Sequence, residues 1–390
     1  MKVEPSITLV ASEKGLPAVR TSGAGNWLVL LLLLTLPATV RAQFNYTINS
    51  DLTITITGYT GPGGAVVIPD SLVGLPVIGI ASGAFQGYPA PTSVAISTNV
   101  TSIASMAFQN CTSLTNIAIP RSVTNMVSQS LWGCGKLMEI MVDPSNAVYS
   151  GVDGVLFNKS QTTLIQCPQG KIGNYAMPNT VTNIGSYAFW TCSGLTNLTI
   201  GTNVITIADR GFFECKGLTS IIIPDSVITL GSEAFEWFDG LTNVAIGTRV
   251  ATLGDFSFAE CNALPRVTIP NSVTNIGQYA FTSCGNLTSV IVGSRVTRIG
   301  ANAFSSCAVL EGVYFKGNAP SVGSSAFSFA NHAIVYSIIC LGRRIGFLRL
   351  AAVRRCYGIL SRSILQCKQI NLGSPSLVIT CRLLWKPARI

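Results

Sequence analysis

The sequence of 390 residues predicts a repeat solenoid, mostly β-strand and turn, in which short parallel strands stack one coil above the next. Two observations carry this prediction. One bulky apolar residue returns at a period of 23, and each period contains a short segment in which apolar and polar residues alternate. A single unit has too few apolar residues for a core of its own, so it folds only when neighbouring units cover it.

The first 42 residues have the features of a secretory leader. Trp27–Leu36 (WLVLLLLLTL) is a run of about ten apolar residues, which is too short to cross a bilayer and typical of a signal-peptide core. Val40–Ala42 offers a small-residue cleavage site, so we expect residues 1–42 to be a leader cleaved near Ala42. A membrane anchor is the alternative interpretation. No other run reaches about 18 apolar residues, so we expect no stable membrane span in the mature chain.

Residues 43–68 predict an N-terminal β cap. The segment from Phe44 reads FNYTINSDLTITITGYTGPGGAVVIP, which is a strand, a turn and a strand without the repeat's Phe and Cys. A solenoid needs a terminal element to cover the core of its first coil, and this hairpin is suited to that position.

Residues 69–330 carry the repeat itself. The segment L-T-x-V-x-I predicts one short strand with one face inward, and Pro or Gly ends it. V-T-x-I-G predicts a second extended piece, and A-F-x-x-C closes the turn. The bulky residues lie 23 positions apart, except for one step of 58, which is 23 plus 35: Phe85, Phe108, Leu131, Phe189, Phe212, Phe235, Phe258, Phe281, Phe304 and Phe327.

The long step marks an insertion over residues 143–177. Within it, VLFNKSQTTLI has two apolar runs around a polar Asn-Lys-Ser-Gln turn, which predicts a hairpin that projects from one coil. Such an insert can form part of a binding face, or it can be a decoration without function.

Residues 331–390 lack the repeat and form a basic tail. The last 48 residues carry ten Lys or Arg and no acidic residue. Residues 43–342 carry 11 basic and 14 acidic residues, a net of −3, so the formal charge of +9 does not indicate a nucleic-acid partner. A basic segment that docks on a membrane is one interpretation of the tail, although its spacing gives no clean helical face.

The unit I-P-x-S-V-T-x-I-G-x-x-A-F-x-x-C-x-x-L-T-x-V resembles the BspA-like leucine-rich repeat, a 23-residue class. The resemblance covers about Val66 to Ala330. It implies a curved, right-handed leucine-rich-repeat array with a parallel sheet on the concave face. It also implies a secreted or surface-exposed protein that binds or adheres through that face rather than an enzyme.

Members of that family often end in a Tyr-Leu-x-Gly strand followed by a Phe-Gly-Gly motif. The genetic code allows codons for Ile338–Leu360 to spell such an ending in another reading frame. We therefore predict a frameshift near Tyr336, and a basic tail that is not an evolved structure.

Seven cysteines occupy the third place after the bulky residue: Cys111, Cys134, Cys192, Cys215, Cys261, Cys284 and Cys307. Stacked coils bring equivalent residues to about 5 Å, within the range of a disulfide. Because Phe238 and Tyr88 fill the same place in other units, we favour buried free thiols over a disulfide ladder.

Candidate catalytic chemistry is sparse. His332 is the only histidine, and it lies at the end of the array. The carboxylates Asp225, Glu233, Glu236 and Asp239 are close in sequence, and we interpret them as a solvated edge rather than an acid–base pair or a calcium site. We expect no catalytic residue, no cofactor and no metal ligand.

If a binding face exists, we expect it on the outward side of the concave strands. The candidate binding surface is Asn197, Thr199, Ser220, Ile222, Asn243, Ala245, Arg266, Thr268, Ser289, Ile291 and Tyr314, and Asn116 and Ala118 are equivalent in earlier units. These side chains are small and mostly neutral, so a strongly charged ligand is not favoured. A plain soluble sheet surface is the alternative.

Two functions follow as hypotheses. The first is a non-catalytic binding or adhesion module for a protein or glycan outside the cell. The alternative is an extracellular enzyme, or an enzyme-associated protein, with its site in the insert or the C-terminal segment. The insert offers only Asp143, Asp153, Lys159 and Lys171 as ionisable groups, which disfavours the alternative.

Overall fold

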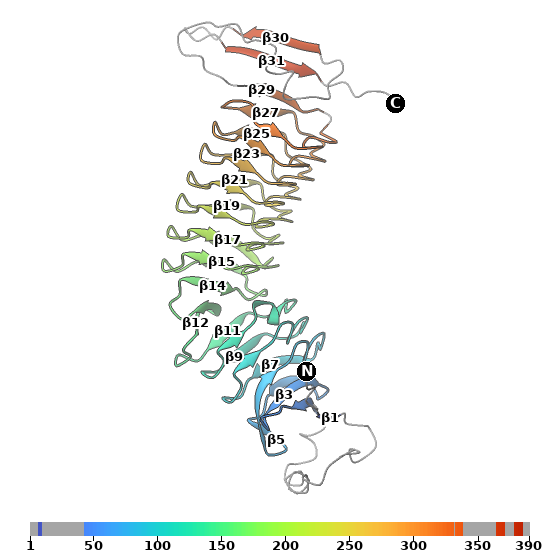
Figure 1. Ribbon diagram of the computed structural model, residues 1–390, viewed down its shortest axis with the longest axis vertical. Helices are drawn as coiled ribbons and strands as arrows, with labels where there is room; N and C mark the ends of the chain where they lie inside the picture. The colour runs from blue at the N-terminus through green and yellow to red at the C-terminus, as the bar shows by residue number, and fades with distance from the viewer. Residues whose placement is uncertain (1–6, 10–42, 331, 338–363, 371–377, 385–390) are drawn as a thin grey trace, which may run out of the picture. The chain divides into compact units, whose positions relative to one another are not determined.

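The computed structural model describes residues 7–9, 43–330, 332–337, 364–370 and 378–384 (Figure 1). The predicted signal-peptide core, its cleavage site and most of the basic tail lie outside these residues. The chain forms two compact units, Met1–Ile172 and Gly173–Ile390, which are described here one at a time.

Unit 1 begins with an antiparallel hairpin, as the sequence predicts. Strands β2 (Phe44–Ile48) and β3 (Ile54–Tyr59) pair antiparallel, and β1 (Ile7–Leu9) pairs antiparallel with β2. A parallel ladder continues from β3 through β6 (Leu75–Ile80), β8 (Ser102–Ile103) and β10 (Asn125–Met126), and β5 (Ser71–Leu72) pairs with β6.

A second parallel sheet in unit 1 contains the longer strand of each coil. Its strands are β4 (Gly64–Val67), β7 (Pro91–Ala95), β9 (Asn116–Ile119) and β11 (Glu139–Val142). One 3-10 turn, Ser128–Leu131, follows β10 and precedes β11. Parallel pairing begins at β3 in the first sheet and at β4 in the second, and both strands lie within the segment predicted as the cap.

The insert forms an antiparallel meander, which confirms the predicted hairpin and adds a strand to it. The hairpin does not project from its coil as predicted, because the apolar side chains Val155, Leu156, Phe157 and Leu164 are fully buried in the core. Strand β13 (Val155–Asn158) pairs with β14 (Thr163–Gln166) across the Asn-Lys-Ser-Gln turn, and β12 (Tyr149–Val152) pairs with β13 on its other side.

Unit 2 repeats the two-strand coil, here called a rung, without interruption (Figure 1). The longer strands are β15 (Gly173–Ala176), β17 (Leu195–Thr199), β19 (Ser220–Ile222), β21 (Asn243–Ala245), β23 (Arg266–Thr268), β25 (Ser289–Val292), β27 (Gly312–Phe315) and β29 (Ile334–Ser337). The short strands are β16 (Asn183–Ile184), β18 (Thr206–Ile207), β20 (Thr229–Leu230), β22 (Thr252–Leu253), β24 (Asn275–Ile276), β26 (Arg298–Ile299) and β28 (Ser321–Val322). Beyond the rungs, β30 (Ile364–Ile370) and β31 (Val378–Leu384) pair antiparallel.

The core is a column of stacked phenylalanines. Phe235, Phe258 and Phe281 are fully buried, and their ring centroids follow one another at 5.2 and 5.3 Å with interplanar angles of 8° and 5°. This spacing is close to the separation of adjacent strands, about 4.8 Å, because each ring comes from the next coil. The 23-residue period therefore specifies the register of the whole stack.

The turn around each core phenylalanine also bonds to the next rung through its backbone. The amide N–H of Phe258 donates to the carbonyl of Ala280 at 2.8 Å, and that of Phe281 donates to Ala303 at 2.7 Å. The residues two before and two after the phenylalanine have left-handed backbones, for example Phe256 with φ 55° and Glu260 with φ 57°. The small residue before each phenylalanine is thus the acceptor that connects neighbouring coils.

The stacking leaves no room for a side chain at Gly277, which ends one V-T-x-I-G segment. A Cβ on Gly277 would lie 2.6 Å from the carbonyl carbon and oxygen of Gly254 in the preceding rung. Real Cβ atoms do not approach backbone that closely, so a larger residue here would force the two rungs to shift, although Ala104 and Ala208 fill the equivalent place in other rungs.

The seven rung cysteines are buried thiols outside any disulfide, as favoured from the sequence. In six of them the thiol donates a hydrogen bond to the carbonyl of the core residue one rung earlier, for example Cys261 to Phe235 at 3.3 Å and Cys307 to Phe281 at 3.0 Å. Burial raises the pKa of the Cys261 and Cys284 thiols. A protonated thiol that donates to a carbonyl fills a core position and has little nucleophilic character.

Candidate functional site

The outward side of the longer strands, here called the long-strand face, presents the side chains predicted as the binding surface. Along β19 and β21 the inward residues Ile221 and Val244 are buried, whereas their neighbours on the same strands are exposed. Asn197, Thr199, Ser220, Ile222, Asn243, Ala245, Arg266 and Thr268 are exposed, and Ser289, Ile291 and Tyr314 are half-buried. All eleven candidate residues therefore lie at the surface of unit 2.

Parallel pairing arranges these side chains in rows. Ile222 lies opposite Ala245 on the next strand, and Thr268, Ile291 and Tyr314 follow one another in a second set of paired strands. Ile222 has 68% of its surface exposed, which is unusual for isoleucine. The rows give a small, largely neutral surface in which Arg266 is the only charged candidate.

The last paired strands of unit 2 carry an aromatic pair. The rings of Tyr314 and Tyr336 stack at 4.7 Å with an interplanar angle of 5°. The Tyr314 ring lies directly over Gly312. A Cβ on that glycine would lie only 2.6 Å from the tyrosine Cε2, so a side chain there would displace the ring. Partial burial raises the pKa of Tyr314, as do the nearby Tyr336 and Glu311. The long-strand face therefore becomes aromatic toward β29.

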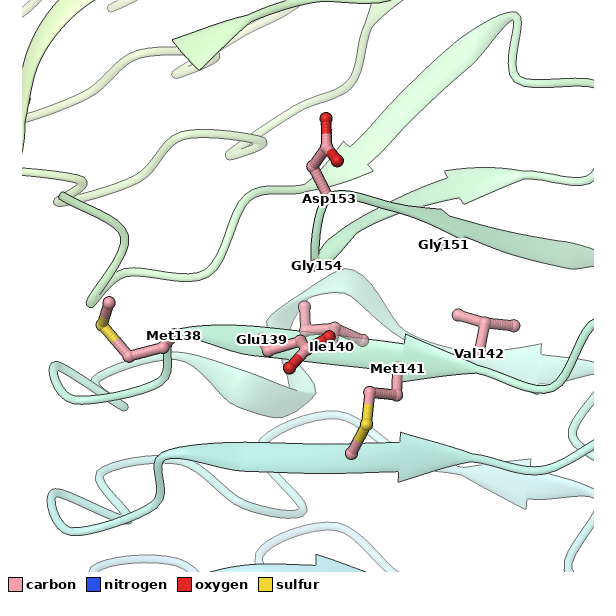
Figure 2. A pocket seen from close by; sticks show the side chains of 8 residues that line it. All are labelled: Met138, Glu139, Ile140, Met141, Val142, Gly151, Asp153 and Gly154. Carbon is pink, nitrogen blue, oxygen red and sulfur yellow. The ribbon is translucent and has the colours of Figure 1, made fainter. Parts of the chain in front are cut away.

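In unit 1 the same face has more exposed apolar surface. Ala118 lies between Ala95 and Met141 in one row, and Asn116 lies beside Ala118 on β9. A shallow hollow adjoins β11, with Met138 and Glu139 on one side and Gly151, Asp153 and Gly154 on the other (Figure 2). In Figure 2 the carboxylate of Asp153 points away from β11, so the two acids of this hollow do not converge.

The Asp153–Gly154 turn is the part of this hollow that the sequence prediction missed. Asp153 and Gly154 have φ values of 51° and 76°, and the carbonyl of Gly154 accepts the N–H of Ile140 on β11 at 2.8 Å. An Asp-Gly pair between apolar residues is a strong signal for a two-residue hairpin turn, and it could have revealed the β12–β13 pairing.

The ionisable groups of the insert are bound separately to backbone. Lys171 Nζ donates to the Asp153 carbonyl at 2.6 Å, and Lys159 Nζ donates to the Pro144 carbonyl at 2.9 Å. Asp143 accepts the N–H of Ser145 at 2.8 Å. These groups hold loops together and do not form a convergent cluster of the kind an acid–base site needs.

Of the four carboxylates interpreted as a solvated edge, Asp225 and Asp239 are exposed, whereas Glu233 and Glu236 are half-buried next to each other, which corrects the interpretation for this pair. Asp225 accepts the N–H of Thr248 at 2.7 Å, and Asp239 accepts the side-chain amide of Asn262 at 2.9 Å. Glu233 instead holds Arg210 in a two-point ion pair. Glu236 is half-buried beside Glu233, so it is not freely solvated.

No metal centre is found within the described ranges, where no group of three or more His, Cys, Asp or Glu side chains could hold a metal ion. His332 is exposed next to the last rung. Among the same residues no helix is long and apolar enough to cross a membrane.

Comparisons with solved structures find similar proteins among bacterial leucine-rich repeat proteins. A leucine-rich repeat protein from Bacteroides ovatus is 22% identical, with a TM-score of 0.50 over 75% of this chain and 80% of that chain. One from Eubacterium ventriosum is 21% identical, with a TM-score of 0.46 over 80% and 96%. A leucine rich cell surface protein from Faecalibacterium prausnitzii is 23% identical, with a TM-score of 0.40 over 71% and 94%. A search of curated proteins found no match.

The sequence also matches a protein family directly. The BspA type leucine rich repeat region, in six copies, matches residues 78–177, 167–250 and 229–340. These ranges together cover more than half of the 390 residues, and they include the rungs whose longer strands form the long-strand face. The chain therefore belongs to the family of BspA-type leucine-rich repeat proteins.

Proposed function

We propose that the protein is a secreted or surface-exposed binding module that holds a protein or glycan ligand on its long-strand face. The observation that carries this proposal is the run of exposed or half-buried, largely uncharged side chains on consecutive parallel strands, from Asn197 to Tyr314. Membership of the BspA-type repeat family supports it. The apolar segment Trp27–Leu36 supports export, since its length suits a signal peptide.

Repeat arrays are suited to ligand binding because different residues stabilise the fold and form the surface. The inward Leu, Val, Ile and Phe side chains stabilise each rung, while the outward positions are free to vary without loss of core contacts. Ile222 is 68% exposed and lies next to Ala245, which gives an apolar patch that a ligand can cover. The proposed function is non-catalytic. The candidate side chains of this face are small and, apart from Arg266, uncharged, so they suit contact with a ligand rather than acid–base chemistry.

Single substitutions on the face test the proposal. The full chain is applied to panels of purified extracellular proteins and immobilised glycans, and saturable binders are measured again with Ile222→Asp and Arg266→Glu. We expect at least about a tenfold loss of affinity for one of the two, since a buried contact at an interface is typically worth more than 1 kcal/mol. Thr202→Asp, at an exposed turn position outside the strands of the face, is the matched control. Affinities equal to that of the control for both variants would contradict the proposal.

A further inference from the structure

Six aromatic side chains lie outside the core of unit 2, on the turns that carry the core phenylalanines of five successive rungs. Each is exposed or half-buried. We call this set the aromatic ridge: Tyr187, Trp190, Phe213, Trp237, Phe256 and Tyr279. None of the candidate residues of the long-strand face belongs to it, so it is a second surface.

Backbone hydrogen bonds align one row of the ridge across the rungs. In the row two positions before each core phenylalanine, the amide N–H of Tyr187 donates to the Asp209 carbonyl at 3.2 Å, that of Arg210 to Ser232 at 2.9 Å, and that of Glu233 to Asp255 at 2.8 Å. In the next two rungs the amide of Phe256 donates to the Gln278 carbonyl at 2.8 Å, and that of Tyr279 to Ala301 at 2.9 Å. This row therefore holds the ridge residues Tyr187, Phe256 and Tyr279, with Arg210 and Glu233 between the first two.

Side-chain contacts along the ridge alternate aromatic rings with charged groups. The rings of Phe256 and Tyr279 stack at 4.5 Å, and those of Tyr187 and Trp190 meet edge-on at 6.3 Å. Arg210 lies 5.4 Å from the centre of the Tyr187 ring. Lys216 Nζ lies 5.5 Å from the centre of the Trp237 ring, so this surface already holds cations over aromatic faces.

The ridge occupies backbone positions where aromatic residues are unfavourable. Trp237, Phe256 and Tyr279 have φ values of 63°, 55° and 56°, in the left-handed region that favours Gly and Asn. Asn302 and Ser325 fill the equivalent row in later rungs. Large rings at strained positions are explained more readily by a role at the surface than by stability.

The same rungs concentrate negative charge. Residues 209–260 contain eight acidic and three basic residues, a net charge of −5. The whole chain has 16 acidic residues. Half of the acidic residues of the chain therefore lie in these 52 positions. The long-strand face is mostly neutral, so the two surfaces fit ligands of different charge.

The carboxylates exceed the cations that could neutralise them. Partial burial raises the pKa of Glu236 to about 7, together with a hydrogen bond to Glu233 and repulsion from Glu233 and Glu260. Glu233 is already occupied by Arg210, with Nε–Oε2 and Nη2–Oε1 distances of 2.5 and 2.7 Å. The other charged or titratable groups around Glu236 are Glu214, Asp239, Lys216 and the Cys261 thiol.

We propose that the aromatic ridge is a docking surface for a basic segment of a partner protein, in which Lys or Arg residues alternate with apolar ones. Trp and Tyr are the residues that most often anchor protein interfaces, and six aromatic rings on adjacent rungs can cover apolar side chains. A Lys or Arg from the partner fits between an aromatic face and the crowded carboxylates at Glu236. A glycan would use the rings but would not need the net charge of −5.

A random peptide library selected on the full chain tests this proposal. We expect the enriched peptides to combine Lys or Arg with apolar residues. One such peptide is then synthesised, and its affinity is measured by titration calorimetry at pH 5.5 and pH 8. Because Glu236 is ionised only at the higher pH, we expect binding to be at least about threefold tighter there. High salt should weaken it, since the pairing groups are partly exposed.

Three variants locate the peptide. Trp237→Ala should weaken binding by about tenfold or more. Glu236→Gln keeps the side-chain shape and should remove most of the pH dependence, so it tests the proposal even if Trp237→Ala disturbs folding. Phe329→Ala is the matched control, because Phe329 occupies the same turn position as Trp237, with φ 59° and 72% exposure, beyond the ridge. Enrichment without basic residues, or equal losses in Trp237→Ala and Phe329→Ala, would overturn the proposal.

Discussion

Replacing Phe258 with alanine tests the stacked core at a rung in the interior of unit 2. Phe258 is fully buried, and its ring lies 5.2 Å from that of Phe235 and 5.3 Å from that of Phe281. Burial of the side chain contributes about 1.5–3 kcal/mol, and each stacked pair adds about 0.5–1.5 kcal/mol. The rungs cannot collapse into the space because their backbones are bonded to one another. We therefore expect Phe258→Ala to cost about 3–5 kcal/mol.

Native-state hydrogen exchange is the suitable assay, because long repeat arrays do not always unfold in one step. The amide of Phe235 bonds to the Ser257 carbonyl at 2.9 Å, next to the substituted residue, and the amide of Phe281 bonds to the Ala303 carbonyl. Each rung contacts only its neighbours, so these two amides should lose protection before that of Phe108 does.

Two control substitutions separate packing from other effects. Phe258→Leu should cost less than half as much, because Leu131 fills the equivalent place in unit 1 and is fully buried there. Phe329→Ala removes an aromatic ring that is 72% exposed and should change stability by less than about 0.5 kcal/mol. The reasoning fails if Phe258→Ala lies within 1 kcal/mol of the parent, or if protection falls equally at distant rungs.

Four further predictions concern other parts of the chain. Glu236→Gln should stabilise the protein at pH 8 but not at pH 4. The folded-state pKa of about 7 lies above the usual 4.5, so stability falls as pH rises between them. Because the group is partly exposed, we expect about 1 kcal/mol in thermal unfolding; equal gains at both pH values would contradict this. The rung cysteines should react with a thiol reagent once the protein is denatured, and no reductant should be needed. A Cys261–Cys284 disulfide found by mass spectrometry would show the core-thiol interpretation to be wrong. Gly277→Ala should destabilise the array by about 1–3 kcal/mol in urea denaturation, since the added Cβ meets backbone, and an unchanged midpoint would refute that contact. Re-reading the nucleotide sequence near Tyr336 should reveal a second frame that encodes the Tyr-Leu-x-Gly and Phe-Gly-Gly ending; without such a frame, the predicted frameshift is wrong.

The repeating part of the fold could be predicted because the same physical requirement acts in every rung. A core position such as Phe258 must match Phe235 and Phe281 in size and register, so the 23-residue period is visible in a single sequence. In L-T-x-V-x-I, apolar and other residues alternate, and this alternation predicts which side chains point inward. The outward residues from Asn197 to Tyr314 are therefore predicted at the surface, where the structure has them. Whether they bind a ligand stays a prediction.

The aromatic ridge could not be seen in the same way, because it consists of departures from the repeat. Trp237 and Phe256 occupy positions that vary from unit to unit, and a search for recurring residues averages them away. A comparison of residues 23 apart would have found the charge pair Arg210–Glu233 and the ring pair Phe256–Tyr279. The raised pKa of Glu236 depends on burial, on Glu233 of the same rung and on Glu260 of the next rung, which no spacing rule describes.

The register of the last described rung bears on where the repeat stops. Strand β29 still pairs in step with β27, with Tyr336 opposite Tyr314 and Ser337 opposite Phe315. The repeat geometry therefore continues through Ser337, just past the point near which the frameshift is predicted. The domain division at residue 330 stays a prediction, but the strand pairing extends at least seven residues beyond it.

The rung-to-rung hydrogen bonds have a kinetic consequence. Each of these bonds joins residues about 22–26 apart, as in Phe258 to Ala280 or Cys307 to Phe281. Over the 295 residues from 43 to 337, a typical separation of 23 corresponds to a relative contact order of roughly 0.08, in the range of helical bundles rather than of β-sandwiches. An all-β chain of this kind closes only short loops as it folds, and each rung can form as soon as the next 23 residues have left the ribosome.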